Sequence, residues 1–220
     1  MIVPMALLLA ALAATSNIAF GQQTEGKPAA SRTGPRPMLA IAEEVSLARS
    51  AAPLSISAKA RVLVLTDTGY AVADGGSSDV TCVVNRSWNV SIEPHCYDSE
   101  AAVTVMPLEL RRNYLRHLGR SEKDIEDDLA RGLASGKYRL PARPAMTYMM
   151  SPAQVLYDDD GSHVGKWRPH LMIYYPNLTN RMVALPEKPE MRVGMVTGSG
   201  AESSLMIVLA AFAEPPSSHR

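Results

Sequence analysis

Residues 108–139 read LELRRNYLRHLGRSEKDIEDDLARGLASGKYR, and this stretch sets the class of fold that the chain can adopt. Leu108, Leu115 and Leu118 share one helical face, which predicts a first helix. Gly119 stands where a glycine commonly ends a helix, because it adopts a left-handed conformation without strain.

A second helix is predicted directly after Gly119. Ser121 and Asp124 resemble a capping box, with Asp in place of the usual Glu, and Gly136 can end the helix. The apolar positions in between recur at helical spacing: Ile125, Leu129 and Leu133. Two helices joined by a short turn also occur in DNA-binding proteins. The mixed charges of EKDIEDD argue against phosphate contact, so packing on a sheet is favoured.

Runs with strand character flank this helical pair. Before the helical pair, three apolar runs predict a meander: 61–65, 70–73 and 80–85. After the pair, six more runs predict strands: 145–150, 154–157, 164–167, 171–175, 191–196 and 205–212. Residues 38–50 predict an N-terminal helix with Ile41, Val45 and Ala48 on one face. The sequence therefore predicts an α+β fold with a mainly antiparallel sheet, an N-terminal helix and a central pair of helices.

The first 21 residues have the composition of a signal peptide. They contain no charged side chain, and residues 6–14 read ALLLAALAA, which is too short for a membrane span. Ala19 and Gly21 place small side chains before a cut at Gln22. We expect a secreted or periplasmic protein with no stable membrane span after cleavage; an uncleaved N-terminal anchor is the alternative.

The composition of the rest of the chain indicates where its segments begin and end, and which partners are not expected. We expect a flexible linker at 22–37, one globular domain at 38–213 and a disordered tail at 214–220. Because 22 Lys and Arg balance 22 Asp and Glu, the chain lacks the charge of a general nucleic-acid binder, and no nucleic-acid partner is expected. The 46% apolar content excludes a mostly disordered chain.

Cys82 and Cys96 are the two cysteines of the chain. In an oxidising compartment they predict a disulfide. Closing a loop of about 15 residues stabilises a fold by roughly 3 kcal/mol in the chain-entropy model. A metal pair or a nucleophilic cysteine would instead need a thiol that stays reduced.

The predicted disulfide loop and its end carry Trp88, Glu93, His95 and Asp98. A fixed loop with such side chains can form a binding site, for which Trp88 and His95 are candidates. His95, Glu93 and Asp98 are also candidates for acid–base catalysis. The alternative is that Trp88 anchors a core and His95 is a satisfied polar residue. On an extended strand, His95 and the adjacent Cys96 point to opposite faces and cannot bind one metal together.

Four stretches carry a resemblance to known proteins: TCVVNRSW (81–88), PHCYDSEAA (94–102), LGRSEKDIEDDLARGLASGKYRLPARP (118–144) and TYMMSPAQ (147–154). They resemble a group of exported bacterial proteins, with the likeness running from about residue 42 to 212. The resemblance implies export and a bacterial source. It implies no activity, cofactor or catalytic residue.

A second polar and aromatic cluster is Trp167, Arg168 and His170. On a continuous strand, His170, Met172 and Tyr174 share one face. Arg168 and His170 could bind a carboxylate or a phosphate, and His170 joins the catalytic candidates. The alternative is a sheet edge, where proline is commonly found.

Other motifs give no cofactor or metal prediction. The DDDG turn at 158–161 lacks the acidic donors of an EF-hand, so a hairpin turn is favoured over an irregular calcium site. Methionines cluster at 146, 149 and 150; thioethers can bind Cu(I), but core filling is the commoner role. The chain has no HExxH, GxGxxG, P-loop or G-x-S-x-G motif.

Taken together, the sequence favours an exported binding or interaction module, held by one disulfide, for a small molecule or a protein. The alternative is a secreted or periplasmic hydrolase that uses His and carboxylate residues near the disulfide loop. Geometry discriminates between the two: the hydrolase is favoured if His95 and His170 converge in one pocket with a carboxylate within hydrogen-bond reach.

Overall fold

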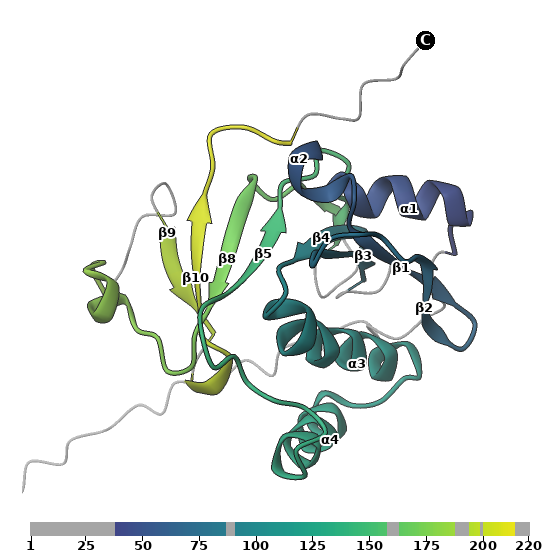
Figure 1. Ribbon diagram of the computed structural model, residues 1–220. Helices are drawn as coiled ribbons and strands as arrows, with labels where there is room; N and C mark the ends of the chain where they lie inside the picture. The colour runs from purple at the N-terminus through teal and green to yellow at the C-terminus, as the bar shows by residue number, and fades with distance from the viewer. Residues whose placement is uncertain (1–37, 87–90, 158–162, 188–193, 199, 214–220) are drawn as a thin grey trace, which may run out of the picture.

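The computed structural model describes residues 38–86, 91–157, 163–187, 194–198 and 200–213 (Figure 1). The predicted signal peptide, linker and tail, Trp88 and the turn at 158–161 lie outside these residues. Within the described ranges, no helix combines the length and the apolar composition that crossing a membrane requires.

Eight strands form one sheet in the order β2-β1-β3-β4-β5-β8-β10-β9. Their bounds are β1 Arg61–Thr66, β2 Gly69–Asp74, β3 Thr81–Asn85, β4 Glu93–Tyr97, β5 Ala145–Met149, β8 His170–Tyr174, β9 Gly194–Thr197 and β10 Ser204–Val208. A separate pair consists of β6 (Leu156–Tyr157) and β7 (His163–Gly165). In the described sheet only β1 and β3 pair in parallel, which confirms the mainly antiparallel α+β fold.

The first three strands do not form the predicted meander. β2 pairs with one side of β1, but β3 pairs with the other side and runs parallel to β1. The chain between β2 and β3 passes close to the start of β1: a Cβ on Gly76, at φ +61, would lie 2.4 Å from the Arg61 nitrogen. Only glycine fits such a crossing. The Gly75-Gly76 pair signals a turn, but it does not reveal on which side of β1 the next strand pairs.

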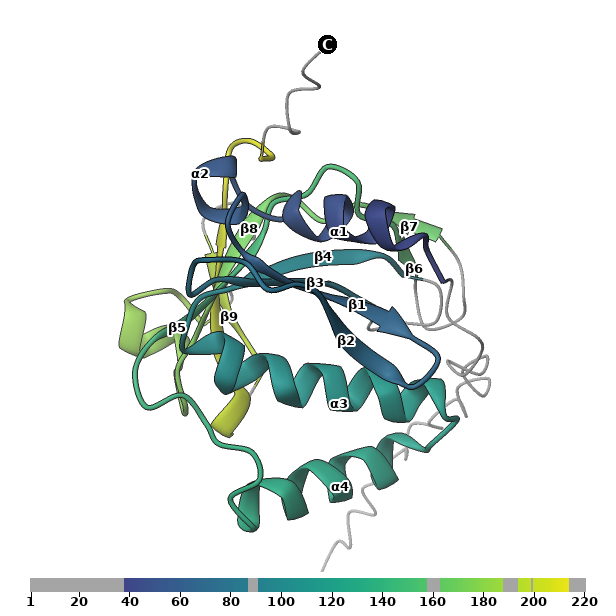
Figure 2. The ribbon, with the colours of Figure 1, turned by 45° about the vertical axis from the view of Figure 1, so that its right-hand side comes forward.

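Helices cover both faces of the β1–β4 half of the sheet (Figure 2). Helix α1 (Ile41–Arg49), followed by α2 (Leu54–Ser57), lies on one face, and α3 (Val105–His117) lies on the other. Helix α4 (Glu122–Ala134) packs outside α3. The described part also has short 3-10 turns at Ala101–Val103, Asn180–Val183 and Gly200–Glu202.

The ends of α3 and α4 agree with their sequence signals. The Ser121 hydroxyl accepts a hydrogen bond from the Asp124 amide at 3.1 Å, which caps α4. Gly119 and Gly136 both adopt φ +74. Between the two helices, Leu108 and Leu115 of α3 pack against the apolar stripe of α4: Ile125, Leu129 and Leu133.

The buried face of α1 agrees in part with the predicted one, since Val45 also packs against the core that contains Ala48. Ala48 is buried as expected, but Ile41 is 65% exposed, and the fully buried neighbour of Ala48 is Glu44. Glu44 is paired with Arg86, directly after β3, whose guanidinium donates two hydrogen bonds of 2.9 Å to the carboxylate. A charge that has a buried partner can therefore replace an apolar residue at this contact.

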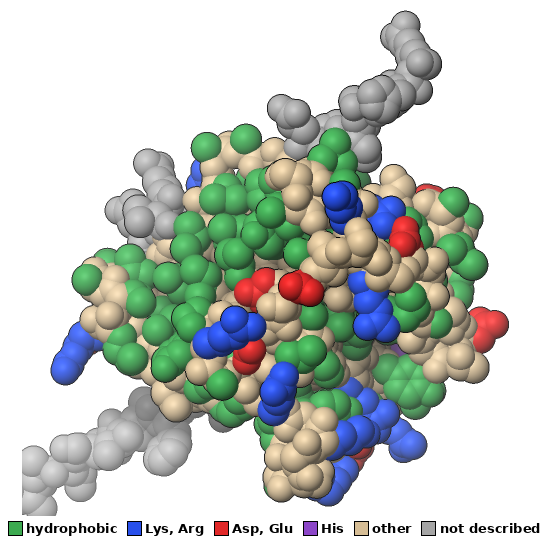
Figure 3. Space-filling model, in the orientation of Figure 1, with side chains coloured by type: hydrophobic (Ala, Val, Ile, Leu, Met, Phe, Trp, Pro, Cys, Tyr) green, Lys and Arg blue, Asp and Glu red, His purple; other side chains and the backbone are tan. Residues whose placement is uncertain are grey.

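The C-terminal half of the sheet is less covered. Figure 3 shows hydrophobic side chains gathered over β9, β10 and β8, where no helix covers the side in view. β8 lies between β5 and β10, so the interpretation of residues 167–175 as a sheet edge is wrong. Because side chains alternate along a strand, Leu171 and Ile173 face one side of β8, and His170 and Met172 face the other.

The predicted disulfide joins Cys82 of β3 to Cys96 of β4, which are direct partners across the two strands. Both cysteines are fully buried, and they pack in the core beneath α1 with Ala48 and Val62. The adjacent His95 therefore faces the opposite side of the sheet, as the alternation of a strand requires.

Removing the disulfide is expected to lower the free energy of unfolding by about 3 kcal/mol, because a bridge over about 15 residues restricts the unfolded chain by that amount. The Cys82→Ala/Cys96→Ala double variant avoids an unpaired thiol. Urea unfolding of this variant beside the oxidised parent measures the difference. Coincident unfolding midpoints would show that the bridge adds no stability.

Candidate functional site

A cavity of about 580 Å³ lies between α3 and the sheet. It lies on the face of the sheet opposite the disulfide. Strands β4, β5, β8, β9 and β10 form its floor, and α3 forms one wall. The residues that line it are Glu93, His95, Glu109, Arg112, Asn113, Arg116, Met149, Trp167, His170, Met172, Tyr174, Met195, Thr197 and Met206.

His95 lies at the polar end of this cavity and is 4% exposed. Its Nδ1 lies 2.7 Å from the Asn85 amide nitrogen, 3.0 Å from the Tyr97 hydroxyl and 3.5 Å from Glu109 Oε2. Its Nε2 is buried and has no hydrogen-bond partner among the described residues. Since buried polar atoms are nearly always hydrogen-bonded, this nitrogen is suited to receive a ligand atom.

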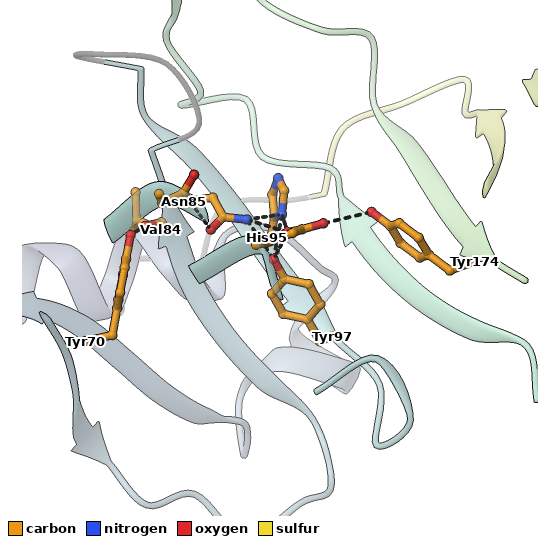
Figure 4. Close-up of polar contacts among 8 residues, drawn as sticks. Tyr70, Val84, Asn85, His95, Tyr97 and Tyr174 are labelled. Carbon is orange, nitrogen blue, oxygen red and sulfur yellow. Dashed lines mark hydrogen bonds and ion pairs between the residues drawn. The ribbon is translucent and has the colours of Figure 1, made fainter. Parts of the chain in front are cut away.

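The Glu109 carboxylate is the common acceptor of a polar cluster next to His95. Figure 4 shows Asn85 and Tyr97 of this cluster close to His95, and Tyr174 on the far side of the carboxylate that they share. Glu109 Oε2 accepts hydrogen bonds from the Tyr97 hydroxyl at 2.5 Å and the Asn85 amide at 2.8 Å. Its Oε1 accepts one from the Tyr174 hydroxyl at 3.1 Å, so two tyrosines from different strands converge on one carboxylate. This cluster links α3 to β3, β4 and β8.

The charge of Glu109 sets the protonation of its neighbours. Burial by itself raises the pKa of Glu109, but the hydrogen bond and charge of His95, with the donors Tyr97 and Asn85, outweigh it and bring the pKa below the ordinary value. Burial and the nearby carboxylate raise the pKa of Tyr97 and Tyr174 well above the ordinary value. Glu109 is therefore an anion at neutral pH, and both hydroxyls are donors.

The orientation of Asn85 fixes which nitrogen of a neutral His95 carries the proton. A carboxylate only accepts, so the Asn85 atom beside Glu109 is the NH₂ group. Its carbonyl oxygen accepts from Asn113 at 2.9 Å. The same NH₂ group faces His95 Nδ1, which must then accept. The neutral ring consequently carries its proton on Nε2, and the protonated ring, whose Nδ1 donates to Glu109, carries one there as well, so Nε2 is a donor in both forms.

His170 lines the cavity from β8 and is 3% exposed. Its Nδ1 donates to the Arg168 carbonyl at 2.6 Å, which leaves the lone pair on Nε2. Burial lowers the pKa of His170, and the charge of His95 lowers it further, against the effect of the Arg168 carbonyl. The cavity thus has a histidine donor from β4 and a neutral histidine with a free lone pair from β8.

The two arginines of the cavity wall already have carboxylate partners. Arg112 lies 2.9 Å from Glu202, and Arg116 lies 2.8 Å from Glu122. Burial by itself lowers the pKa of Arg112, but the neighbouring carboxylates Glu202 and Glu126 raise it above the ordinary value. With the acidic side chains Glu93 and Glu109 on the same wall, the polar end does not have the excess positive charge of an anion site.

The structure brings four of the sequence candidates together, because His95, Glu93, His170 and Trp167 all line the cavity. Asp98 is not in this lining; its carboxylate accepts from the Ala101 amide at 2.7 Å. The Arg168 side chain is exposed and also absent from the lining. Trp88 lies outside the described residues.

Sequence reasoning missed Glu109, Asn85 and Asn113. One signal could have found two of them: Glu109, Asn113 and Arg116 recur at helical spacing in residues 105–117, beside the apolar stripe. A polar stripe adjoining the buried face of a helix indicates side chains at the rim of a core. Asn85 carries no such signal, because a polar residue at the end of a strand is common.

Comparison with known proteins identifies no relative. No protein-family model matches the chain, and neither curated proteins nor solved structures include a match.

Proposed function

We propose that this chain is an exported binding protein whose cavity takes up a small amphipathic organic molecule. The observation that carries the proposal is the buried Nε2 of His95, a residue that lines the cavity; this nitrogen has no hydrogen-bond partner among the described residues. The disulfide supports an oxidising compartment.

The size and lining of the cavity support this ligand class. A volume of about 580 Å³ lies in the range of small-molecule sites. Methionine and tryptophan side chains provide apolar contacts, and methionine adapts to ligands of different shape. His95 provides a donor and His170 an acceptor. A ligand with an uncharged polar group and an apolar body satisfies both ends without disturbing the paired arginines.

A library of small amphipathic compounds tests the proposal by thermal shift on the purified chain. A ligand present at 100 times its Kd should stabilise the protein by about 2.7 kcal/mol. His95→Gln replaces the fixed ring N–H by the amide of a flexible side chain and should weaken binding by about tenfold, which corresponds to one hydrogen bond. His117→Gln is the matched control, because His117 belongs to α3 but is not in the cavity lining. No shift with any compound, or equal shifts in both variants, would contradict the proposal.

A second candidate function is hydrolysis of a small ester or amide. It is favoured by the Glu109 carboxylate, 3.5 Å from His95 Nδ1, in the same cavity as His170, which is the arrangement expected above for a hydrolase. Hydrolysis stands second because the described residues that line the cavity include no serine or cysteine to act as a nucleophile. When His95 takes up a proton, Glu109 stabilises the imidazolium, and Nε2 can then protonate a leaving group. Glu109 would thus have the role that the sequence suggested for Glu93 or Asp98. Turnover of chromogenic esters should fall at least 100-fold in His95→Gln and remain unchanged in His117→Gln. If ligands bind but no ester is hydrolysed, hydrolysis is contradicted and the binding function remains.

A further inference from the structure

The apolar lining of the cavity has an unusual composition. Every aliphatic side chain in the described lining is a methionine: Met149, Met172, Met195 and Met206. The opposite face of the same strands carries ordinary aliphatic residues, with Leu171 and Ile173 on β8 and Leu205 and Ile207 on β10. On β8 and β10 methionine is therefore confined to one face, whereas β5 carries Met149 on the cavity face and Met146 on the opposite face.

Strand register brings these methionines together. Met172 of β8 is the direct partner of Met206 of β10, and Met206 is the direct partner of Met195 of β9. In the neighbouring row, Met149 of β5 is the direct partner of His170 of β8. Direct partners in antiparallel strands have Cβ atoms about 5 Å apart. Long, flexible thioether side chains at that spacing can reach a common point.

Core filling does not account for this arrangement. Methionine fills irregular gaps inside packed cores, but these four side chains border a cavity of about 580 Å³. Leucine would give the same apolar surface with less side-chain entropy to lose. Adaptable contact with an organic ligand is one use of these methionines, and binding of a soft metal through sulfur is a second, which their register beside His170 permits.

His170 is prepared for the same role. Its Nδ1 donates to the Arg168 carbonyl at 2.6 Å, and a metal-binding histidine is typically held by such a backbone contact on its other nitrogen. Its Nε2 keeps the lone pair. His95 differs, because Asn85 makes its Nε2 a donor in the neutral ring. His170 is therefore the histidine suited to a metal, and His95 the one suited to an organic ligand.

We propose that Met149, Met172, Met206 and His170 bind one Cu(I) ion. Thioether and imidazole ligands are soft and uncharged, and they favour Cu(I) over hard divalent ions. In the described part of the chain, no group of three or more His, Cys, Asp or Glu residues could hold a metal ion, so the described residues offer no site of the kind that zinc or calcium prefers. Both cysteines are in the disulfide and do not compete for copper.

The proposal is tested by titrating the purified chain with Cu(I) under ascorbate, in competition with bicinchoninate, and with Ag(I) as a soft ion that needs no reductant. One ion per chain should bind. The Met149→Leu/Met172→Leu/Met206→Leu variant keeps the apolar volume and removes the sulfur ligands, so its Cu(I) affinity should fall at least 100-fold. Met182→Leu is the matched control, because Met182 is 63% exposed and is not in the cavity lining.

Three results would overturn the proposal: no Cu(I) or Ag(I) bound by the parent, unchanged affinity in the triple variant, or equal affinity for Zn(II). The triple variant also separates this site from the proposed organic ligand. If thermal shifts by organic compounds persist in it while Cu(I) affinity is lost, both proposals stand. If the triple variant keeps both its Cu(I) affinity and its thermal shifts with organic compounds, the copper site is contradicted and the binding function still stands.

Discussion

Glu44→Ala is expected to lower the free energy of unfolding by about 3–5 kcal/mol, because it leaves the Arg86 guanidinium buried without its counter-charge. The side chains of Arg86 and Glu44 are 0% and 1% exposed. Besides two hydrogen bonds from Arg86, the Glu44 carboxylate accepts one from the Leu65 amide at 2.9 Å. Burial by itself lowers the pKa of Arg86, but the hydrogen bond and charge of Glu44 raise it above the ordinary value.

The matched variant is Glu44→Leu/Arg86→Met, which removes both charges and fills their volume. Replacing a buried ion pair by apolar residues is often close to neutral in stability. The double variant should therefore be more stable than Glu44→Ala by several kcal/mol. The Leu65 amide loses its acceptor in both variants, so that cost does not enter their difference. Urea unfolding of the parent and the two variants measures this. Equal destabilisation by the single and double changes would show that packing, not charge pairing, holds α1 on the sheet.

This ion pair shows where prediction from sequence reached its limit in the fold. The helical spacing in residues 38–50 and the strand pattern of 61–85 located the elements. Ala48 was placed correctly on the buried face of α1, but the buried Glu44 was not expected there, because its burial depends on a partner 42 residues away. The parallel pairing of β1 with β3 was missed for a similar reason, since local turn residues do not determine which edge the returning strand joins.

In the candidate site, too, some residues could be recognised from the sequence and others depend on tertiary packing. His95, Glu93, Trp167 and His170 were recognised because their residue types carry chemistry wherever they lie. Glu109 was not, because it gains its role only when α3 packs on β4 and β8. Its contact with Tyr174 spans 65 residues of sequence. The methionine face emerges only from the register of β8, β9 and β10, which no local pattern specifies.

Glu109→Ala is expected to lower the free energy of unfolding by about 4 kcal/mol. The Tyr97 hydroxyl, the Asn85 amide and the Tyr174 hydroxyl each lose their acceptor, and a buried donor left without a partner costs about 1–3 kcal/mol. Release of Asn85 should also free the His95 ring and weaken any ligand that depends on its Nε2. Urea unfolding at pH 7, with ligand titration by thermal shift, measures both effects.

Glu109→Gln separates hydrogen bonding from charge. The amide oxygen can accept from Tyr97 and Asn85, and the amide nitrogen can donate to Tyr174, whose hydroxyl can turn to accept. Hydrogen bonds to a charged acceptor are roughly twice as strong as those to a neutral one, so a loss of about 1 kcal/mol is expected. If the glutamine and alanine variants were equally unstable, the negative charge and not the satisfied donors would be the source of stability.

The pH dependence of the same variants tests the charge directly. The fold brings the pKa of Glu109 below its ordinary value, so its ionised form stabilises the folded chain. That stabilisation is complete above the unfolded pKa of about 4.3 and is lost as the pH falls through the lower pKa of the folded state. The parent should therefore exceed Glu109→Gln in stability at neutral pH and lose this advantage on acidification. A stability difference that stayed constant from pH 7 to pH 2 would mean that Glu109 is not ionised in the fold, and the carboxylate could not then support a proton on His95.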